Sequence, residues 1–189
     1  FERPMWYARK NQKAEYQYSF GYQNWYESAE FETTHARKYV ALFELTPFSK
    51  FEMKGTNAHE ALQYLCANNI KDTEGNTTYT QMLNSNGGIE ADLTVTCIEK
   101  KIFRVVSGAA VRSHDKKHIL NNLKYDVEFS DITENFACLG LFGPKSRDLL
   151  TDLAGDKFNT EQFPFGSGKF LTVEGISIWF QRLSYVGEF

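Results

Sequence analysis

The sequence predicts an α/β (α+β) fold in which a mixed or antiparallel sheet contains split βαβ, ferredoxin-like elements. From residue 51 onward, strand and helix patterns follow in the order β, α, β, β, α, β, and a further β-α unit comes after them. A glycine-rich turn at residues 84–88 joins the two limbs of a hairpin. No G-x-G-x-x-G motif follows any expected strand, which argues against a doubly wound dinucleotide-binding fold.

Composition and charge narrow the class of protein. The 189 residues are 42% hydrophobic and 24% charged, which is typical of one globular domain with a real core. The net charge of −3 argues against nucleic acid or an anionic membrane as a partner. No apolar stretch approaches the roughly 20 residues of a membrane span. Because the chain begins with Phe1 rather than Met, we expect it to be part of something longer.

The first third of the chain predicts an irregular arm, a helix and two strands. Residues 1–27 lack a steady period and carry four aromatic anchors, which are Trp6, Tyr7, Trp25 and Tyr26. Residues 28–40 predict a helix with Phe31 facing inward. Residues 41–45 and 48–54 predict strands, because Thr46-Pro47 interrupts them and proline has no place in a central strand.

The middle of the chain predicts a helix, the hairpin and a buried strand. A helix follows Asn57, and its apolar stripe is made of Ala58, Leu62, Leu65 and Cys66. The hairpin covers residues 79–96, and a buried strand follows at residues 102–106. The three cysteines lie far apart, with apolar neighbours, which favours buried thiols over a disulfide framework or a metal site.

The last third predicts further strands between helices. A helix after residue 110 directs Ile119, Leu120 and Leu123 inward, and it carries His114 and His118 without a third metal ligand, so we predict no metal site. Strands are expected at 125–129 and at 136–142, the latter buried on both faces. A helix follows Gly143-Pro144, a second hairpin spans 170–180, and residues 181–189 continue as a strand.

Asp92 is the unusual residue of the first hairpin, because aspartate is disfavoured inside strands. It lies between Ala91 and Leu93 on the return limb. Such a carboxylate is either solvated on the open face of the sheet or held in a site, and the pattern alone leaves both readings open. The sequence shows no Ser-His-Asp arrangement, phosphate-binding loop or metal-binding motif that would name a reaction.

Four motifs carry a resemblance to a known family: the Tyr79 hairpin with GGIEADL, the segment VALFELTPFSKF, the tetrapeptide LFGP and the terminal SYVGE. The whole chain resembles the folate-binding aminomethyltransferases, which include the glycine-cleavage T-protein and the C-terminal folate domains of dimethylglycine and sarcosine dehydrogenases. The resemblance implies that residues 1–27 are an arm at the junction with a flavin domain. It also implies that residues 28–189 are the N-terminal part of the folate-binding domain, incomplete at the C-terminus.

The resemblance implies tetrahydrofolate-dependent one-carbon transfer. An iminium derived from an N-methyl amine would be converted to 5,10-methylenetetrahydrofolate, with Asp92 as the catalytic proton acceptor. The family usually carries two adjacent aspartates here, and Ala91 stands in place of the first. Folate would be contacted by Tyr79, Tyr185, the backbone of Val105, and Ser107, which stands where the family usually has asparagine.

The same resemblance implies the partners. FAD would belong to a companion flavin dehydrogenase domain absent from this chain. Alternatives are a stand-alone T-protein that acts on a lipoyl carrier protein, a folate-binding scaffold without activity, and a relative that demethylates a sulfonium compound. The glutamate and arginine that grip the pterin in the family lie beyond Phe189, so we expect the chain alone to bind folate weakly or not at all. The expected compartment is the cytoplasm, or the mitochondrial matrix in a eukaryote.

Overall fold

The computed structural model describes residues 5–184 and is organised around a five-stranded sheet. Its strands are β2 (Ser49–Lys54), β3 (Thr77–Leu83), β4 (Ile89–Glu99), β5 (Ile102–Ser107) and β6 (Glu128–Asp131), in the spatial order β3-β4-β5-β2-β6. All four pairings are antiparallel. Helices α2 (Ala58–Leu65) and α3 (Arg112–Asn122) lie in the connections. The predicted fold class is confirmed, with three strands rather than two between the helices.

One face of this sheet and the two helices enclose the core. Along β4 the side chains of Ala91, Leu93 and Val95 alternate with those of the opposite face, and all three are buried. The stripe predicted on α2 is buried against them, and Ile119 closes the core from α3. Leu120 on the same helix is exposed, contrary to the prediction. Burial raises the pKa of the Cys66 thiol to about 12.

Two small antiparallel sheets accompany the main one. Strand β1 (Ala41–Glu44) pairs with β7 (Leu139–Phe142), and β8 (Gly168–Val173) pairs with β9 (Ile176–Gln181), after helix α4 (Ser146–Ala154). Short 3₁₀ turns lie at η1 (Ala109–Val111), η2 (Thr133–Asn135) and η3 (Asp156–Phe158). The prediction that residues 136–142 are buried on both faces is wrong. Leu139 is 60% exposed, because β7 lies in a two-stranded sheet rather than in the core.

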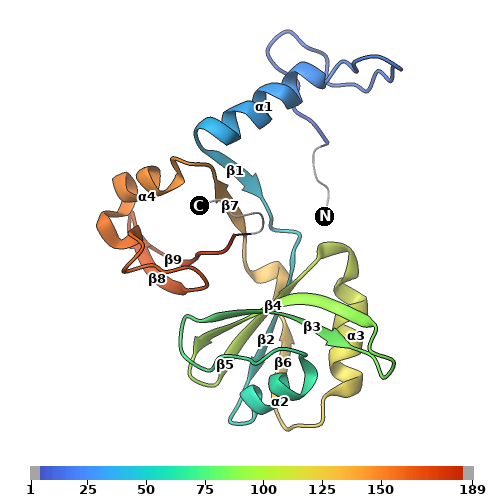
Figure 1. The fold of residues 1–189 in the computed structure, drawn as a ribbon, viewed down its shortest axis with the longest axis vertical. Helices are drawn as coiled ribbons and strands as arrows, with labels where there is room; N and C mark the ends of the chain where they lie inside the picture. The colour runs from blue at the N-terminus through green and yellow to red at the C-terminus, as the bar shows by residue number, and fades with distance from the viewer. Residues whose placement is uncertain (1–4, 185–189) are drawn as a thin grey trace.

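Helix α1 (Tyr26–Lys38) lies at the opposite end of the molecule from α2 (Figure 1). Phe31 is 57% exposed with the Arg9 guanidinium over its ring, so its predicted inward orientation is wrong. Ser28 alone is buried among the residues of this helix. In the preceding arm, Trp25 packs edge-on against Tyr16 and Tyr18. None of the helices among residues 5–184 is long and apolar enough to cross a membrane.

The β8–β9 hairpin covers one end of the outer face of the main sheet, the face away from the core. The Gln181 side-chain amide donates hydrogen bonds to the hydroxyls of Thr77 and Thr96, at 2.7 and 2.9 Å. Both threonines lie at the end of the β3–β4 pair that is remote from its turn. The turn end of the same pair, which carries Asp92, is therefore left outside this contact.

Candidate functional site

The β3–β4 hairpin is held in shape by the side chain of Asn84. Its Oδ1 accepts hydrogen bonds from the backbone N–H groups of Asn86 and Gly88, at 3.0 and 2.9 Å. Gly87 between them has a φ of +80°, which glycine adopts without strain. The turn thus closes on itself, and it fixes the start of β4 relative to the end of β3.

Asp92 lies on the outer face of the hairpin, because its neighbours Ala91 and Leu93 point into the core. It sits opposite Gln81 on β3, and the Gln81 amide donates a hydrogen bond to Asp92 Oδ1 at 3.0 Å. The side chain is exposed. One carboxylate oxygen is therefore oriented by a neighbour, and the carboxylate remains accessible from outside.

A hollow of about 410 Å³ adjoins Asp92. It lies among the start of β4, the residue before β2, η1 and the first turn of α3. Its lining residues are Phe48, Ile89, Glu90, Ala91, Asp92, Gly108, Val111 and Asp115. Asp92 is thus an exposed strand aspartate that also borders a concave surface, which combines the two readings that the sequence left open.

A second acid–base cluster borders the same hollow. The His114 ring lies between two carboxylates, with Nδ1 3.1 Å from Asp115 Oδ1 and Nε2 3.2 Å from Glu90 Oε2. A protonated imidazole has an N–H on each nitrogen and can donate to both. The hydrogen bond with Asp115, with a smaller contribution from Glu90, raises the pKa of His114 above its ordinary value.

Glu90 connects this cluster to the hairpin turn. Its Oε1 accepts a hydrogen bond from the Asn84 amide at 2.9 Å, and this bond lowers the pKa of the Glu90 carboxyl. The turn of the hairpin is therefore joined through Glu90 and His114 to the first turn of α3. The hollow lies between these two elements.

The other predicted site residues that the structure describes do not lie together on one surface. Tyr79 is 59% exposed and shares the outer face with Asp92, since it lies two residues before Gln81 on β3. Val105 is fully buried in the middle of β5, between β4 and β2, so its side chain belongs to the core. Ser107 at the end of β5 is 3% exposed, and its hydroxyl has no hydrogen-bond partner among residues 5–184. Tyr185 lies outside the described residues.

Sequence reasoning missed Glu90 and Asp115 and considered His114 only as a metal ligand. The available signal was the His114-Asp115 pair at the first turn of a helix that follows a buried strand after a short connection. Glu90 could be added only once the hairpin was folded against that helix. No group of three His, Cys, Asp or Glu side chains that could hold a metal ion occurs among the described residues.

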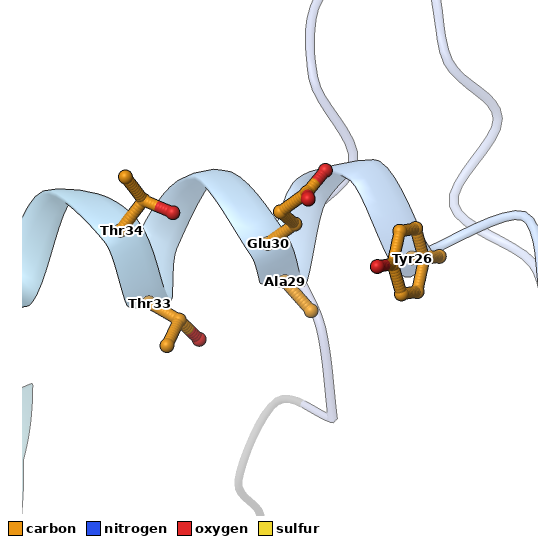
Figure 2. Close-up of a pocket in the computed structure, with 5 residues that line it drawn as sticks. All are labelled: Tyr26, Ala29, Glu30, Thr33 and Thr34. Atoms are coloured by element: carbon orange, nitrogen blue, oxygen red, sulfur yellow. The ribbon is translucent and has the colours of Figure 1, made fainter.

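A separate hollow of about 290 Å³ runs along α1 and contains none of the predicted site residues. Figure 2 shows its five lining residues, Tyr26, Ala29, Glu30, Thr33 and Thr34, which all come from that one helix. Because one helix supplies every wall, this is a shallow groove on its surface, and no pair of carboxylates lines it. The Asp92 hollow remains the better candidate.

Comparison with known proteins shows which family the chain matches. A family model described as the GCVT N-terminal domain matches residues 1–189. The chain is 33% identical to human (Homo sapiens) mitochondrial dimethylglycine dehydrogenase over 191 residues, which cover 100% of this chain and 22% of that protein. It is 31% identical to an aminomethyltransferase of Staphylococcus haemolyticus over 153 residues, or 79% of this chain and 41% of that protein.

Among solved structures, the glycine cleavage system aminomethyltransferase T from Bartonella henselae has a TM-score of 0.68. Its sequence identity is 20%, and the match covers 92% of this chain and 47% of that one. At this identity the likeness shows a shared fold. The chain therefore has the aminomethyltransferase fold. It spans 22% of the length of the human dehydrogenase that it matches.

Proposed function

Because the chain belongs to the GCVT N-terminal domain family, we propose that it is the part of a folate-dependent one-carbon transferase that supplies the proton acceptor, Asp92. The observation that carries this proposal is the placement of Asp92. Its carboxylate is oriented by Gln81 at 3.0 Å, and the residue lines a hollow of about 410 Å³. A base must lie within hydrogen-bond reach of the proton that it accepts, and a residue on the wall of a hollow satisfies that condition for a ligand inside it.

The residues around the hollow fit a reduced pterin, which is flat and rich in N–H donors. Phe48 offers an aromatic ring, and Asp92 offers a carboxylate acceptor. Ser107 adds a buried hydroxyl without a partner among the described residues, next to Gly108 of the lining. Tetrahydrofolate, when bound, supplies the two nitrogens that take up the one-carbon unit to give 5,10-methylenetetrahydrofolate.

In this proposal the chain's own residues position the ligand and accept a proton. Asp92 would accept a proton from bound folate, and its negative charge would favour a cationic iminium beside it. Tyr79 and Tyr185 would line bound folate, and the Val105 backbone and Ser107 would contact the pterin edge. Because Val105 lies within the sheet, its contribution would be limited to its backbone groups.

The proposed donor is an N-methyl amine of the dimethylglycine or sarcosine type, oxidised by a companion flavin domain. The dehydrogenase relative aligns with all of this chain, whereas the aminomethyltransferase relative aligns with 79% of it. This extent of alignment favours the dehydrogenase context over a stand-alone enzyme that acts on a lipoyl carrier protein.

The test is Asp92→Asn in the full-length gene product, with amine oxidation and one-carbon products measured together. We expect unchanged amine oxidation, with formaldehyde replacing 5,10-methylenetetrahydrofolate and trapping by folate reduced by about 100-fold, the lower end of general-base effects. Glu99→Gln is the matched control, because Glu99 is an exposed carboxylate at the far end of the same strand. Unchanged trapping in Asp92→Asn would reject the assignment.

A further inference from the structure

Asp115 has a carboxylate oxygen that the fold leaves without a partner. The residue is 1% exposed, and its Oδ2 is buried with no hydrogen-bond partner among residues 5–184. The other oxygen, Oδ1, lies 3.1 Å from His114 Nδ1. A buried carboxylate oxygen without a donor is costly, and Asp115 lines the hollow, so a ligand there that donates a hydrogen bond would relieve this cost.

The charges around the hollow favour a positive ligand. Glu90, Asp92 and Asp115 place three carboxylates on its lining, and none of the described lining residues is lysine or arginine. Two imidazoles, those of His114 and His118, act on Glu90, and that of His114 is already engaged by Glu90 and Asp115. Phe48 adds an aromatic face, which also attracts cations.

We propose that Asp115 accepts a hydrogen bond from an N–H group of the cationic amine that carries the one-carbon unit, and thereby makes the hollow selective for amines that retain an N–H. The inference rests on the proposed function and names the part of the substrate that Asp115 recognises. Asp92 and Asp115 then have separate roles: Asp92 accepts a proton, and Asp115 orients the amine nitrogen. His114 contacts Asp115 through Oδ1 and leaves Oδ2 without a partner among residues 5–184.

Two substrates separate this role from a general structural one. The iminium formed from sarcosine keeps one N–H, whereas the iminium formed from dimethylglycine has three carbon substituents and no N–H. In the full-length gene product, the fraction of one-carbon units trapped by tetrahydrofolate rather than released as formaldehyde is measured for both. We expect Asp115→Asn to lower the trapped-to-released ratio about tenfold with sarcosine, as loss of a charged hydrogen bond predicts, and to leave it unchanged with dimethylglycine.

Asp126→Asn is the matched control, since Asp126 is an exposed aspartate shortly after the same helix. It should change neither ratio. An equal fall with both substrates in Asp115→Asn, or no fall with sarcosine, would overturn the inference. Unchanged trapping with dimethylglycine also shows that the variant has folded.

A measurement on the unmodified protein covers the case in which Asp115→Asn does not fold. Trimethylammonium has one N–H and tetramethylammonium has none, so the first should suppress trapping of the sarcosine-derived unit at concentrations about tenfold lower. Equal potency would contradict the role of Asp115. Asp92→Asn tests the proposed function independently, because it should lower trapping with both substrates whatever the result at Asp115.

Discussion

The main sheet and helix α1 both carry phenylalanine, but the side chain is buried in the sheet and exposed on the helix. Phe51 on β2 is fully buried and packs against Phe129, whereas Phe31 on α1 is 57% exposed. Figure 1 shows the reason: the sheet is covered by α2 and α3, while α1 and the arm before it extend away from both. An aromatic residue in a regular element is therefore not evidence of a core until a second element lies against it.

This contrast predicts that the same change, phenylalanine to alanine, costs very different amounts of stability at two positions of the 189-residue chain. Phe51→Ala should lower the free energy of unfolding by about 4 kcal/mol, because it removes a fully buried ring and leaves a cavity. Phe31→Ala should lower it by about 0.5 kcal/mol or less, since the ring is largely in water. Urea unfolding of the two variants against the unmodified chain measures both values.

The Phe31 variant in the full-length gene product sharpens the comparison. A loss there of more than about 2 kcal/mol, with a small loss in the 189-residue chain, would mean that another part of the protein covers α1. Similar losses for Phe31→Ala and Phe51→Ala in the chain itself would contradict the contrast between the two regions.

A second prediction concerns the ion pair that holds the start of α3 to β6. The Arg112 guanidinium donates to both carboxylate oxygens of Asp131, at 2.9 and 3.0 Å. Burial acts to raise the pKa of Asp131, but hydrogen bonds from Arg112 and Thr133 outweigh it and lower that pKa to about 2. Arg112→Gln should therefore cost about 2 kcal/mol of stability at neutral pH.

The pH dependence of this cost follows from the direction of the shift. A lowered carboxyl pKa stabilises the fold above the ordinary value of 3.8, and the contribution is lost as the pH falls toward 2. The difference between Arg112→Gln and the unmodified chain should shrink over the same interval. Lys116→Gln is the control, because Lys116 is 3.7 Å from Asp131 and 43% exposed, so its loss should be small. A cost that stays constant through this pH interval would contradict the assignment.

Local sequence patterns predicted the helices and strands better than they predicted which side chains are buried. The two hairpins were found because Gly87 and Gly175 mark turns whose backbone is determined locally. The stripe on α2 was correct because that helix does pack against the sheet. The burial of β7 and the orientation of Phe31 were wrong, because each depends on which element lies opposite, and a period in the sequence does not contain that information.

In the candidate site too, local sequence identified one residue, and the residues that depend on the folded arrangement were missed. Asp92 was identified within one strand, where an aspartate contradicts local preference and the resemblance supplies a role. The resemblance and the strand pattern did not reveal Asp115 or the link from Glu90 to His114. Those side chains meet only after β4 and β5 have brought the hairpin turn beside the first turn of α3. The assignment of Tyr79, Val105, Ser107 and Tyr185 to folate stays a prediction.

The smallest expected effects are those of a Gly→Ala substitution in the turn of each hairpin, and the two hairpins should differ in where the loss of stability appears. Gly87 and Gly175 have φ values of +80° and +81°, and an added Cβ at either would meet open space, so a substitution to alanine changes only backbone strain. Each should cost about 1 kcal/mol. For Gly87→Ala the cost should appear in global unfolding, because β3–β4 is part of the sheet that encloses the core.

For Gly175→Ala we expect the cost to appear locally, since the β8–β9 pair opens without disrupting the main core. Amide hydrogen exchange should accelerate about fivefold within this pair, while the free energy of global unfolding changes by less than about 0.5 kcal/mol. An equal global loss in both variants would place the two hairpins in one cooperative unit. The hydrogen bonds from Gln181 to Thr77 and Thr96 would then be the contacts that couple them, and Gln181→Ala should restore the local behaviour.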